Sequence, residues 1–286
     1  MSIVSAIPST DFPIEEQWTA LEGGRVRYLR CGSGPPVIAL HGLMGYSFSW
    51  RFLIPALAPS FTVFAPDSLG TGFSDRPAAM DNCQSACAER FLAFLDAMHV
   101  ERADFIGSSH GGAICMRAAA LAPNRVRRLV LVSPVNPWSD RGRMLGPFLS
   151  STVISPLFRW LEPLTGVTHS AFLRRLFGDP RRIRPGTLEG YQAPFARPGG
   201  FEHGLSVLKT WGRDLADLEA ALPRIAHIPT LLLWGDKDTA VNPRSAEPLR
   251  RQFRDCRLIW FEGVGHVPYE EVPDDFNRTV VAFLKS

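Results

Sequence analysis

Short, unbroken apolar runs recur along the first and last parts of this chain. They lie at 37–40, 62–65, 103–106, 129–132, 230–234 and 257–261. Such runs, without alternating polar residues, are typical of strands buried on both faces, as in a parallel sheet. The chain must therefore cover both faces of a central sheet, and this requirement limits its possible folds more than any other feature.

Helical patterns separate several of these runs. Helices are predicted over 82–98, near 244–254 and near 273–284. In the first, Phe91 and Phe94 recur at helical spacing and Asp81 is available as N-cap. Strand alternating with helix predicts the α/β class, with a mostly parallel, doubly wound sheet. The opening segment is predicted to be an antiparallel hairpin that turns at Gly23 and Gly24.

The alternation stops between Val132 and Thr230, where helical fragments and prolines replace the buried strands. We predict an inserted helical cap over 137–225 and a core domain formed by 1–136 and 226–286. Residues 138–210 carry ten Lys or Arg against five Asp or Glu. This basic surface is expected to be a solvated outer face, with selection of an anionic substrate as the alternative.

Composition excludes several classes of protein. The 286 residues carry a formal net charge of +3, and no basic run interleaved with aromatic residues indicates nucleic-acid binding. No apolar stretch reaches the roughly 18 residues of a membrane span, and the first residues do not resemble a signal peptide. We expect a cytoplasmic protein acting on a small-molecule substrate, and the sequence leaves its oligomeric state open.

The cysteines do not form a disulfide framework, because they are odd in number and scattered along the chain. They are Cys31, Cys83, Cys87, Cys115 and Cys256. Cys83 and Cys87 are four residues apart on a predicted helix and could share a metal, but no second Cys or His pair lies nearby. Two half-buried thiols are the favoured interpretation, and neither a metal nor an organic cofactor is expected.

The segment Gly107–Gly112 places Ser109 between a predicted buried strand and an Ala-rich helix. A G-x-S-x-G pattern in this context is typical of a nucleophile elbow, where small flanking residues permit a strained turn. A helix beginning just after the serine presents free N–H groups to developing negative charge. Ser108 is the nearby alternative, but it lacks glycines two residues before and after.

A serine nucleophile needs a base, and the base needs a carboxylate that fixes its tautomer. His266 follows the last predicted strand in a glycine-containing loop, a better position than those of the other histidines. Asp236 and Asp238 follow strand 230–234, and Asp236 is the expected turn residue or helix cap. The order Ser109, Asp238, His266 is the one expected for a triad at strand ends of such a sheet.

With these positions in place, the chain resembles the α/β-hydrolase superfamily over nearly its full length, most closely its cap-bearing serine hydrolases and esterases. The motifs that carry the resemblance are HG at 41–42, DSLGTGFS at 67–74, GSSHG at 107–111, WGDKD at 234–238 and GHVP at 265–268. It implies that Asp238 is the acid and that the backbone N–H groups of Leu43 and His110 form the oxyanion hole. A carboxylic ester hydrolase is the expected function.

Two departures from the resemblance narrow the chemistry. Family epoxide hydrolases and haloalkane dehalogenases use an aspartate nucleophile, whereas this chain has Ser109. Family hydrolases of carbon–carbon bonds usually have Trp after the histidine, whereas this chain has Val267. The same triad also supports perhydrolysis, haloperoxidase-like or lyase reactions, carbon–carbon cleavage, or a slow-turnover ligand receptor, and these alternatives stay open.

A substrate pocket is predicted between the sheet and the cap. Its apolar wall is expected from aromatic residues of the insert, although packing of the cap is the alternative role for each. They are Phe148, Phe158, Trp160, Phe172, Phe177, Phe195 and Trp211.

Overall fold

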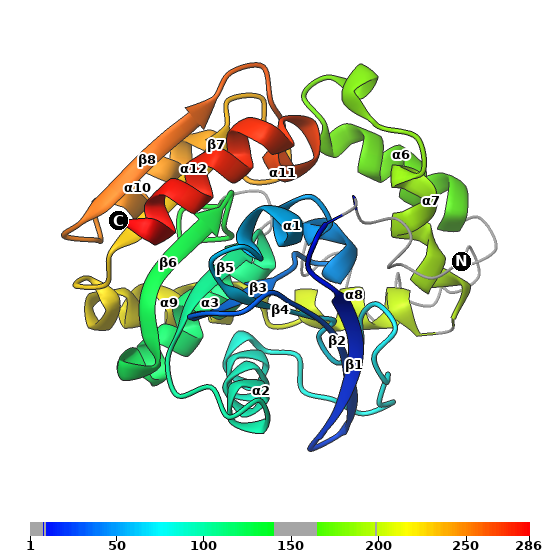
Figure 1. The fold of residues 1–286 in the computed structure, drawn as a ribbon, viewed down its shortest axis with the longest axis horizontal. Coiled ribbons are helices and arrows are strands. Elements are labelled where there is room, and N and C mark those ends of the chain that lie inside the picture. Colours follow the sequence, from blue (N-terminus) through cyan, green and yellow to red (C-terminus); the bar gives the residue numbers. More distant parts are fainter. Residues whose placement is uncertain (1–7, 9, 140–164, 198) are drawn as a thin grey trace.

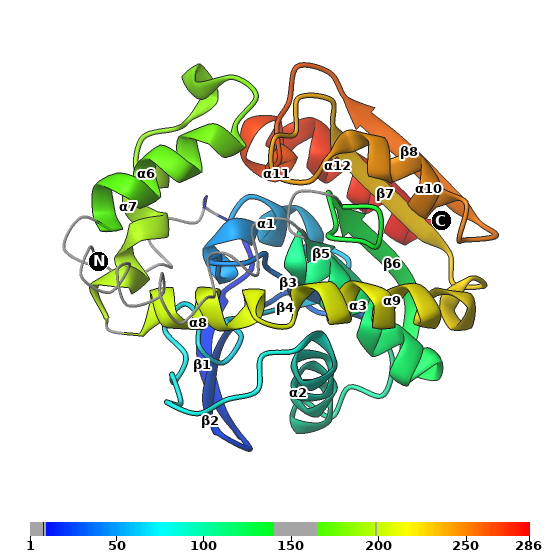
Figure 2. The ribbon, with the colours of Figure 1, turned by 180° about the vertical axis from the view of Figure 1, so that it is seen from behind.

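The computed structural model describes residues 8, 10–139, 165–197 and 199–286, and Figures 1 and 2 show it from opposite sides. An eight-stranded sheet forms its centre, with strand order β1-β2-β4-β3-β5-β6-β7-β8. The strands are β1 (Ile14–Leu21), β2 (Gly24–Cys31), β3 (Pro36–Leu40), β4 (Thr62–Pro66), β5 (Ala103–Ser108), β6 (Val126–Val132), β7 (Thr230–Gly235) and β8 (Cys256–Phe261). The pairs β1–β2 and β2–β4 are antiparallel, and the remaining pairs are parallel. The predicted mostly parallel sheet and opening hairpin are confirmed.

Helices cover both faces of the sheet (Figures 1 and 2). They are α1 (Leu53–Leu57), α2 (Gln84–Ala97), α3 (His110–Leu121), α6 (Thr165–Leu176), α7 (Thr187–Gln192), α8 (Gly200–Leu208), α9 (Trp211–Ala221), α10 (Ala246–Arg250), α11 (Pro268–Glu271) and α12 (Pro273–Lys285). The predicted C-terminal helix is α12, while the one expected near 244–254 is a short 3₁₀ turn followed by α10.

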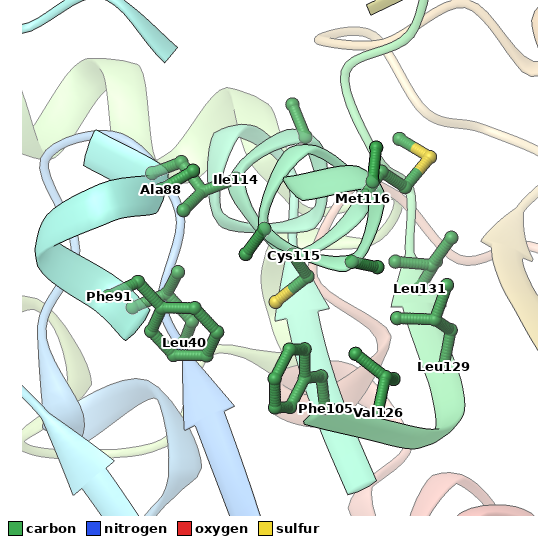
Figure 3. Packing of buried hydrophobic residues seen from close by; sticks show 14 of the residues in the cluster. Leu40, Ala88, Phe91, Phe105, Ile114, Cys115, Met116, Val126, Leu129 and Leu131 are labelled. Atoms are coloured by element: carbon green, nitrogen blue, oxygen red, sulfur yellow. The ribbon is translucent and has the colours of Figure 1, made fainter. Parts of the chain in front are cut away.

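Side chains at alternate positions of the central strands pack in two separate hydrophobic cores. In β6, Leu129 and Leu131 pack with residues of α2, α3 and α9, whereas Val130 and Val132 pack with residues of α1 and α12. Figure 3 shows the first of these cores, in which Cys115 of α3 lies over the sheet. Burial of successive side chains on opposite faces explains why these strands are unbroken apolar runs in the sequence.

Helix α2 begins two residues later than its sequence pattern suggested. Its N-cap is Cys83, whose sulfur accepts a hydrogen bond from the Ala86 N–H at 3.5 Å, and not Asp81. The Asp81 carboxylate instead accepts from the Cys83 N–H at 2.9 Å. Asp81 therefore shapes the turn that enters the helix rather than capping it.

The described residues between β6 and β7 form helices and connecting turns and contain no strand. Helix α6 packs on α7 and one of its ends lies near α11 (Figure 1), while α9 packs against α3 in the same core as the sheet. The division into a core and an insert over 137–225 stays a prediction, because residues 140–164 lie outside the described part of the chain.

The strand order reverses around β3. The chain passes from β3 to β4 on one side and then crosses to β5 on the other. In open α/β sheets, ligands bind outside the carboxyl ends of the strands at such a reversal. Here those ends lead directly into His41–Leu43 after β3 and into Ser109 after β5.

Candidate active site

Ser109 lies between β5 and α3 in a left-handed backbone conformation, with φ of 53° and ψ of −120°. A non-glycine residue rarely adopts this region, and holding it there costs about 1–3 kcal/mol. The main chain holds the turn: the Ser109 N–H donates to the Val132 carbonyl at 2.9 Å, and the Val135 N–H donates to the Ser109 carbonyl at 3.0 Å. The neighbouring Ser108 is fully buried at the end of β5.

Close backbone packing fixes the first turn of α3. A Cβ atom on Gly111 would lie 2.2 Å from the His41 carbonyl oxygen, so a side chain at this position would push the helix away from β3. His110 is the first residue of α3, and its N–H therefore has no acceptor within the helix. The Leu43 N–H also donates to no other described residue. Both amides are available as hydrogen-bond donors at this edge of the sheet.

His266 and Asp238 form a buried pair. The His266 Nδ1 lies 2.8 Å from the Asp238 Oδ2, and each residue is about 5% exposed or less. The other oxygen of Asp238 accepts from the N–H groups of Ala240 and Val241 at 2.8 and 2.9 Å. Because both carboxylate oxygens are used, the Asp238 side chain has one orientation and favours the His266 tautomer with a proton on Nδ1.

Asp236, the alternative acid, lies elsewhere. Its carboxylate is on the exposed side of the loop and accepts from the Gly263 N–H at 2.7 Å. The structure therefore pairs His266 with Asp238 and gives Asp236 the turn-forming contact expected of it.

Ser109 and His266 line one cavity of about 670 Å³. Leu43 and Met44 from the loop after β3 line it too, and α6 contributes Phe172 and Leu173. Most of the exposed surface of this cavity is apolar. Its size and lining suit a small, largely apolar molecule that reaches Ser109.

The predicted aromatic wall is found in part. Phe172, Phe177 and Trp211 line the cavity, although Phe172 is also 47% exposed. Phe195 is absent from the described lining of this cavity. Phe148, Phe158 and Trp160 lie outside the described residues.

A buried ion pair in the wall of the cavity, where Glu270 is a lining residue, carries no clear signal in the sequence. Arg51 donates to both oxygens of Glu270, at 2.5 and 2.6 Å. The Tyr191 hydroxyl donates to Glu270 at 2.7 Å, and Arg51 also donates to Thr187 at 3.0 Å. This network joins the turn after His266 to helix α7. Only the proximity of Glu270 to His266 in the sequence could have suggested it.

Three histidines lie in the loop after β3 or next to it. The His41 Nε2 accepts a hydrogen bond from the Ser68 N–H, and its Nδ1 donates to the Gly42 carbonyl, so His41 stabilises that loop. His110 stacks on Trp211, and burial together with the neighbouring His41 lowers the pKa of His110 to about 4. Burial also lowers the pKa of His203 to about 3. These imidazoles are neutral near pH 7.

The sequence also makes predictions about the cysteines, metal sites and membrane-spanning helices. The Cys87 thiol is half-buried, and burial raises its pKa to about 11. Across residues 10–139, 165–197 and 199–286, no group of three or more His, Cys, Asp or Glu side chains is arranged to hold a metal ion. None of the helices in those ranges is long and apolar enough to cross a membrane.

Comparison with known proteins agrees with this architecture. The family model described as the alpha/beta hydrolase fold matches residues 35–273. Haloalkane dehalogenase 2 of Mycobacterium tuberculosis (strain ATCC 25618 / H37Rv) is 31% identical, over 94% of this chain and 95% of its own length. The 2-hydroxymuconate semialdehyde hydrolase of Pseudomonas sp. (strain CF600) is 30% identical, over 88% of each chain.

A solved structure extends the likeness to three dimensions. A mutant of the meta-cleavage product hydrolase CumD superposes with a TM-score of 0.80 and 26% identity, over 94% of this chain and 97% of CumD. The match of the family model to most of the chain, the two relatives and this superposition lead to one conclusion: the chain belongs to the α/β-hydrolase family.

Proposed function

We propose that this chain is a serine hydrolase that cleaves small-molecule carboxylic esters, or related acyl compounds, through an acyl-serine intermediate. One observation carries the proposal. Ser109 occupies a strained elbow and lines the same cavity as His266, whose imidazole is paired with the buried Asp238. A serine, a histidine and a carboxylate in these roles are the components of acyl transfer.

The chemistry follows from this arrangement. The Ser109 Oγ attacks the substrate carbonyl carbon while His266 Nε2 accepts its proton, and Asp238 stabilises the resulting imidazolium. The N–H groups of Leu43 and His110 bind the oxyanion, each contributing about 3 kcal/mol to the transition state. His266 then protonates the leaving alcohol. It next removes a proton from water, which attacks the acyl-serine and regenerates the free hydroxyl.

The similarity to haloalkane dehalogenase 2 does not change the proposal. The resemblance noted from the sequence implies an aspartate nucleophile in family dehalogenases, and this chain has a serine at the elbow. A serine alkoxide displacing a halide would leave an ether that water does not hydrolyse readily, so turnover would stop. An acyl-serine, in contrast, is hydrolysed through the same oxyanion site.

Hydrolysis of a carbon–carbon bond beside a carbonyl is the second candidate. It is supported by the 30% identical 2-hydroxymuconate semialdehyde hydrolase and by the structural likeness to CumD. Val267 in place of the tryptophan usual in that group weighs against it.

A fluorophosphonate probe and two substrate panels test the proposal. We expect the probe to label wild-type protein at Ser109 and not the Ser109→Ala variant. Ser60, in the turn before β4 and away from the cavity, offers the matched Ser60→Ala control, which should be labelled like wild type. We expect p-nitrophenyl esters of graded chain length to be cleaved, with a carboxylate-bearing series testing selection by the basic insert.

The outcomes separate the candidates. Absence of labelling beside a labelled reference esterase would sink the serine-hydrolase proposal. Labelling with turnover of 2-hydroxymuconate semialdehyde, but of no ester, would favour carbon–carbon hydrolysis. Acyl transfer to added peroxide in preference to water would identify a perhydrolase.

A further inference from the structure

The C-terminal end of α6 contacts both loops that carry the proposed acid and base. The last carbonyl groups of a helix have no partner within it. Here the Arg175 carbonyl accepts from the Thr239 hydroxyl at 2.8 Å, one residue after Asp238. The Leu176 carbonyl accepts from the His266 N–H at 2.7 Å. The two loops thus satisfy the free end of α6, and α6 in turn restrains both loops.

The last residue of α6 and the three residues after it, Leu176–Asp179, pack directly on the backbone of the His266 loop. We call it the docking segment. A Cβ atom on Gly178 would lie 2.7 Å from the Gly263 carbonyl oxygen, and one on Gly265 would lie 2.2 Å from the Leu176 carbonyl oxygen. Neither position has room for a side chain. The absence of side chains at both glycines permits this main-chain contact.

A single buried carboxylate fastens this contact. Glu271 is 6% exposed and accepts from Gly178 N–H at 2.9 Å, Asp179 N–H at 3.2 Å and Gly265 N–H at 2.7 Å. Two donors come from the docking segment and one from the residue before His266. The Arg182 guanidinium lies 3.6 Å from the same carboxylate and compensates its charge. An ionised acceptor shared by amides from two segments holds them together more strongly than neutral contacts would.

We infer that Glu271 is a positioning residue that ties the docking segment to the His266 loop, so that proton transfer at Ser109 requires this segment to be docked. The inference rests on the proposed function for its kinetic consequence, but not for its structural one. Glu271 does not itself line the described cavity, and its carboxylate makes no hydrogen bond to Ser109; it acts through the backbone of Gly265 and His266.

The Glu271→Gln variant is the direct test. Its amide oxygen retains acceptor capacity, but its NH₂ group would face a backbone N–H, so at least one donor loses its partner. We expect exchange of the Gly178, Asp179 and Gly265 amide protons to become about tenfold faster or more. The downfield proton resonance of the His266–Asp238 hydrogen bond should weaken. Both readouts are independent of catalysis.

Kinetics are measured per fluorophosphonate-titrated site, so that loss of folded protein does not count as loss of rate. We expect kcat to fall about 10- to 100-fold in Glu271→Gln, with KM changing much less, because a misplaced base affects the transition state. Glu271→Asp keeps the charge on a shorter side chain and should restore part of the rate. Glu262→Gln is the matched control on the exposed side of the same loop and should behave like wild type.

The results decide the inference whether or not Ser109 proves reactive. A Glu271→Gln variant with wild-type kcat per site, or with unchanged exchange of the three amides, would overturn it. If Glu271→Gln does not fold, Glu271→Asp is judged by the same measurements. If wild-type protein is not labelled at all, the proposed function fails, and amide exchange with the His266 resonance still decides the role of Glu271.

Discussion

The Ser109 elbow and the His266 turn lie across one cavity, but they are held in different ways. The elbow is fixed by main-chain hydrogen bonds to Val132 and Val135 and by glycines at its closest packing points. The His266 turn is fixed by two consecutive buried carboxylates, Glu270 and Glu271, whose partners, apart from Gly265, are distant in the sequence. In the predicted insert, Glu270 is bound by Tyr191 of α7, and Glu271 is bound by the N–H groups of Gly178 and Asp179 in the docking segment.

This difference separates a locally encoded feature from one that depends on distant contacts. The strand, the short glycine-flanked turn and the helix that form the elbow lie within about twenty residues of sequence, and only its packing on His41 and its hydrogen bonds to β6 and the residues after it reach further. The turn requires residues 176–191 to dock on residues 263–271. A change in the insert should therefore disturb His266 while leaving the Ser109 backbone in place.

Removal of the nucleophile is expected to have the largest effect. Ser109→Ala should lower kcat by about 10⁶-fold, because no other group forms the acyl intermediate. Ester hydrolysis measures this, with the concentration of folded variant taken from protein absorbance because Ser109→Ala has no site to titrate. Residual activity within tenfold of wild type would show that the elbow does not carry the chemistry.

The Asp238→Asn change tests the turn side of the comparison. It keeps the shape of the side chain but favours the wrong tautomer of His266, and kcat should fall by about 10⁴-fold. Labelling of Ser109 should slow in parallel, while the elbow conformation stays as it is. A crystal structure of the variant with His266 displaced would assign the loss to geometry instead of tautomer.

The third test is the pH dependence of the free energy of unfolding that His110, the residue after Ser109, contributes. The pKa of His110 is about 4 in the folded chain, so the unfolded chain binds a proton first as the pH falls below about 6.5. Stability is therefore present above pH 6.5 and is lost as the pH falls towards 4. His110→Phe retains the stacking on Trp211 and should remove on the order of 2 kcal/mol of that loss between pH 7 and pH 4.5. Urea unfolding at pH 7 and pH 4.5 measures it, and equal losses in both proteins would contradict this origin.

A glycine pair gives the smallest and most selective test. Gly178→Ala places a methyl group against backbone atoms of residues 263–265 and should lower kcat about tenfold with little effect on the elbow. Gly212→Ala is its matched control, because a Cβ atom there meets nothing within 4 Å. It should leave kcat unchanged and stabilise α9 by about 0.5–1 kcal/mol. Equal kinetics in both variants would argue against coupling through the docking segment.

The same difference explains what could be predicted from the sequence. The buried strands, the elbow and the order of Ser109, Asp238 and His266 are local patterns, and the structure places all three residues at strand ends. Either aspartate follows β7; the sequence favoured Asp238 by giving Asp236 the role of turn residue or helix cap, and the resemblance implied the same choice. The predicted N-cap of α2 was wrong because Asp81 accepts from the Cys83 N–H while the Cys83 sulfur accepts from the Ala86 N–H, and spacing alone does not decide which side chain caps the helix.

The remaining features depend on long-range packing. Nothing in the sequence pairs Arg51 with Glu270, or Glu271 with Gly178, because the partners are more than ninety residues apart. The lining of the cavity likewise depends on how α6 lies against the sheet, which helical periodicity does not specify.

The consecutive glutamates also set a rule for recombination between relatives. Glu270 and Glu271 face different partners, so a deletion or insertion of one residue in α11 would move one glutamate into the position of the other and leave one set of partners without its carboxylate. A chimera that takes residues 165–197 from another hydrolase must therefore take the matching α11 turn as well. A crossover within β7 would separate both carboxylates from their partners in residues 178–191, whereas one directly after β6 would keep Glu271 with the docking segment.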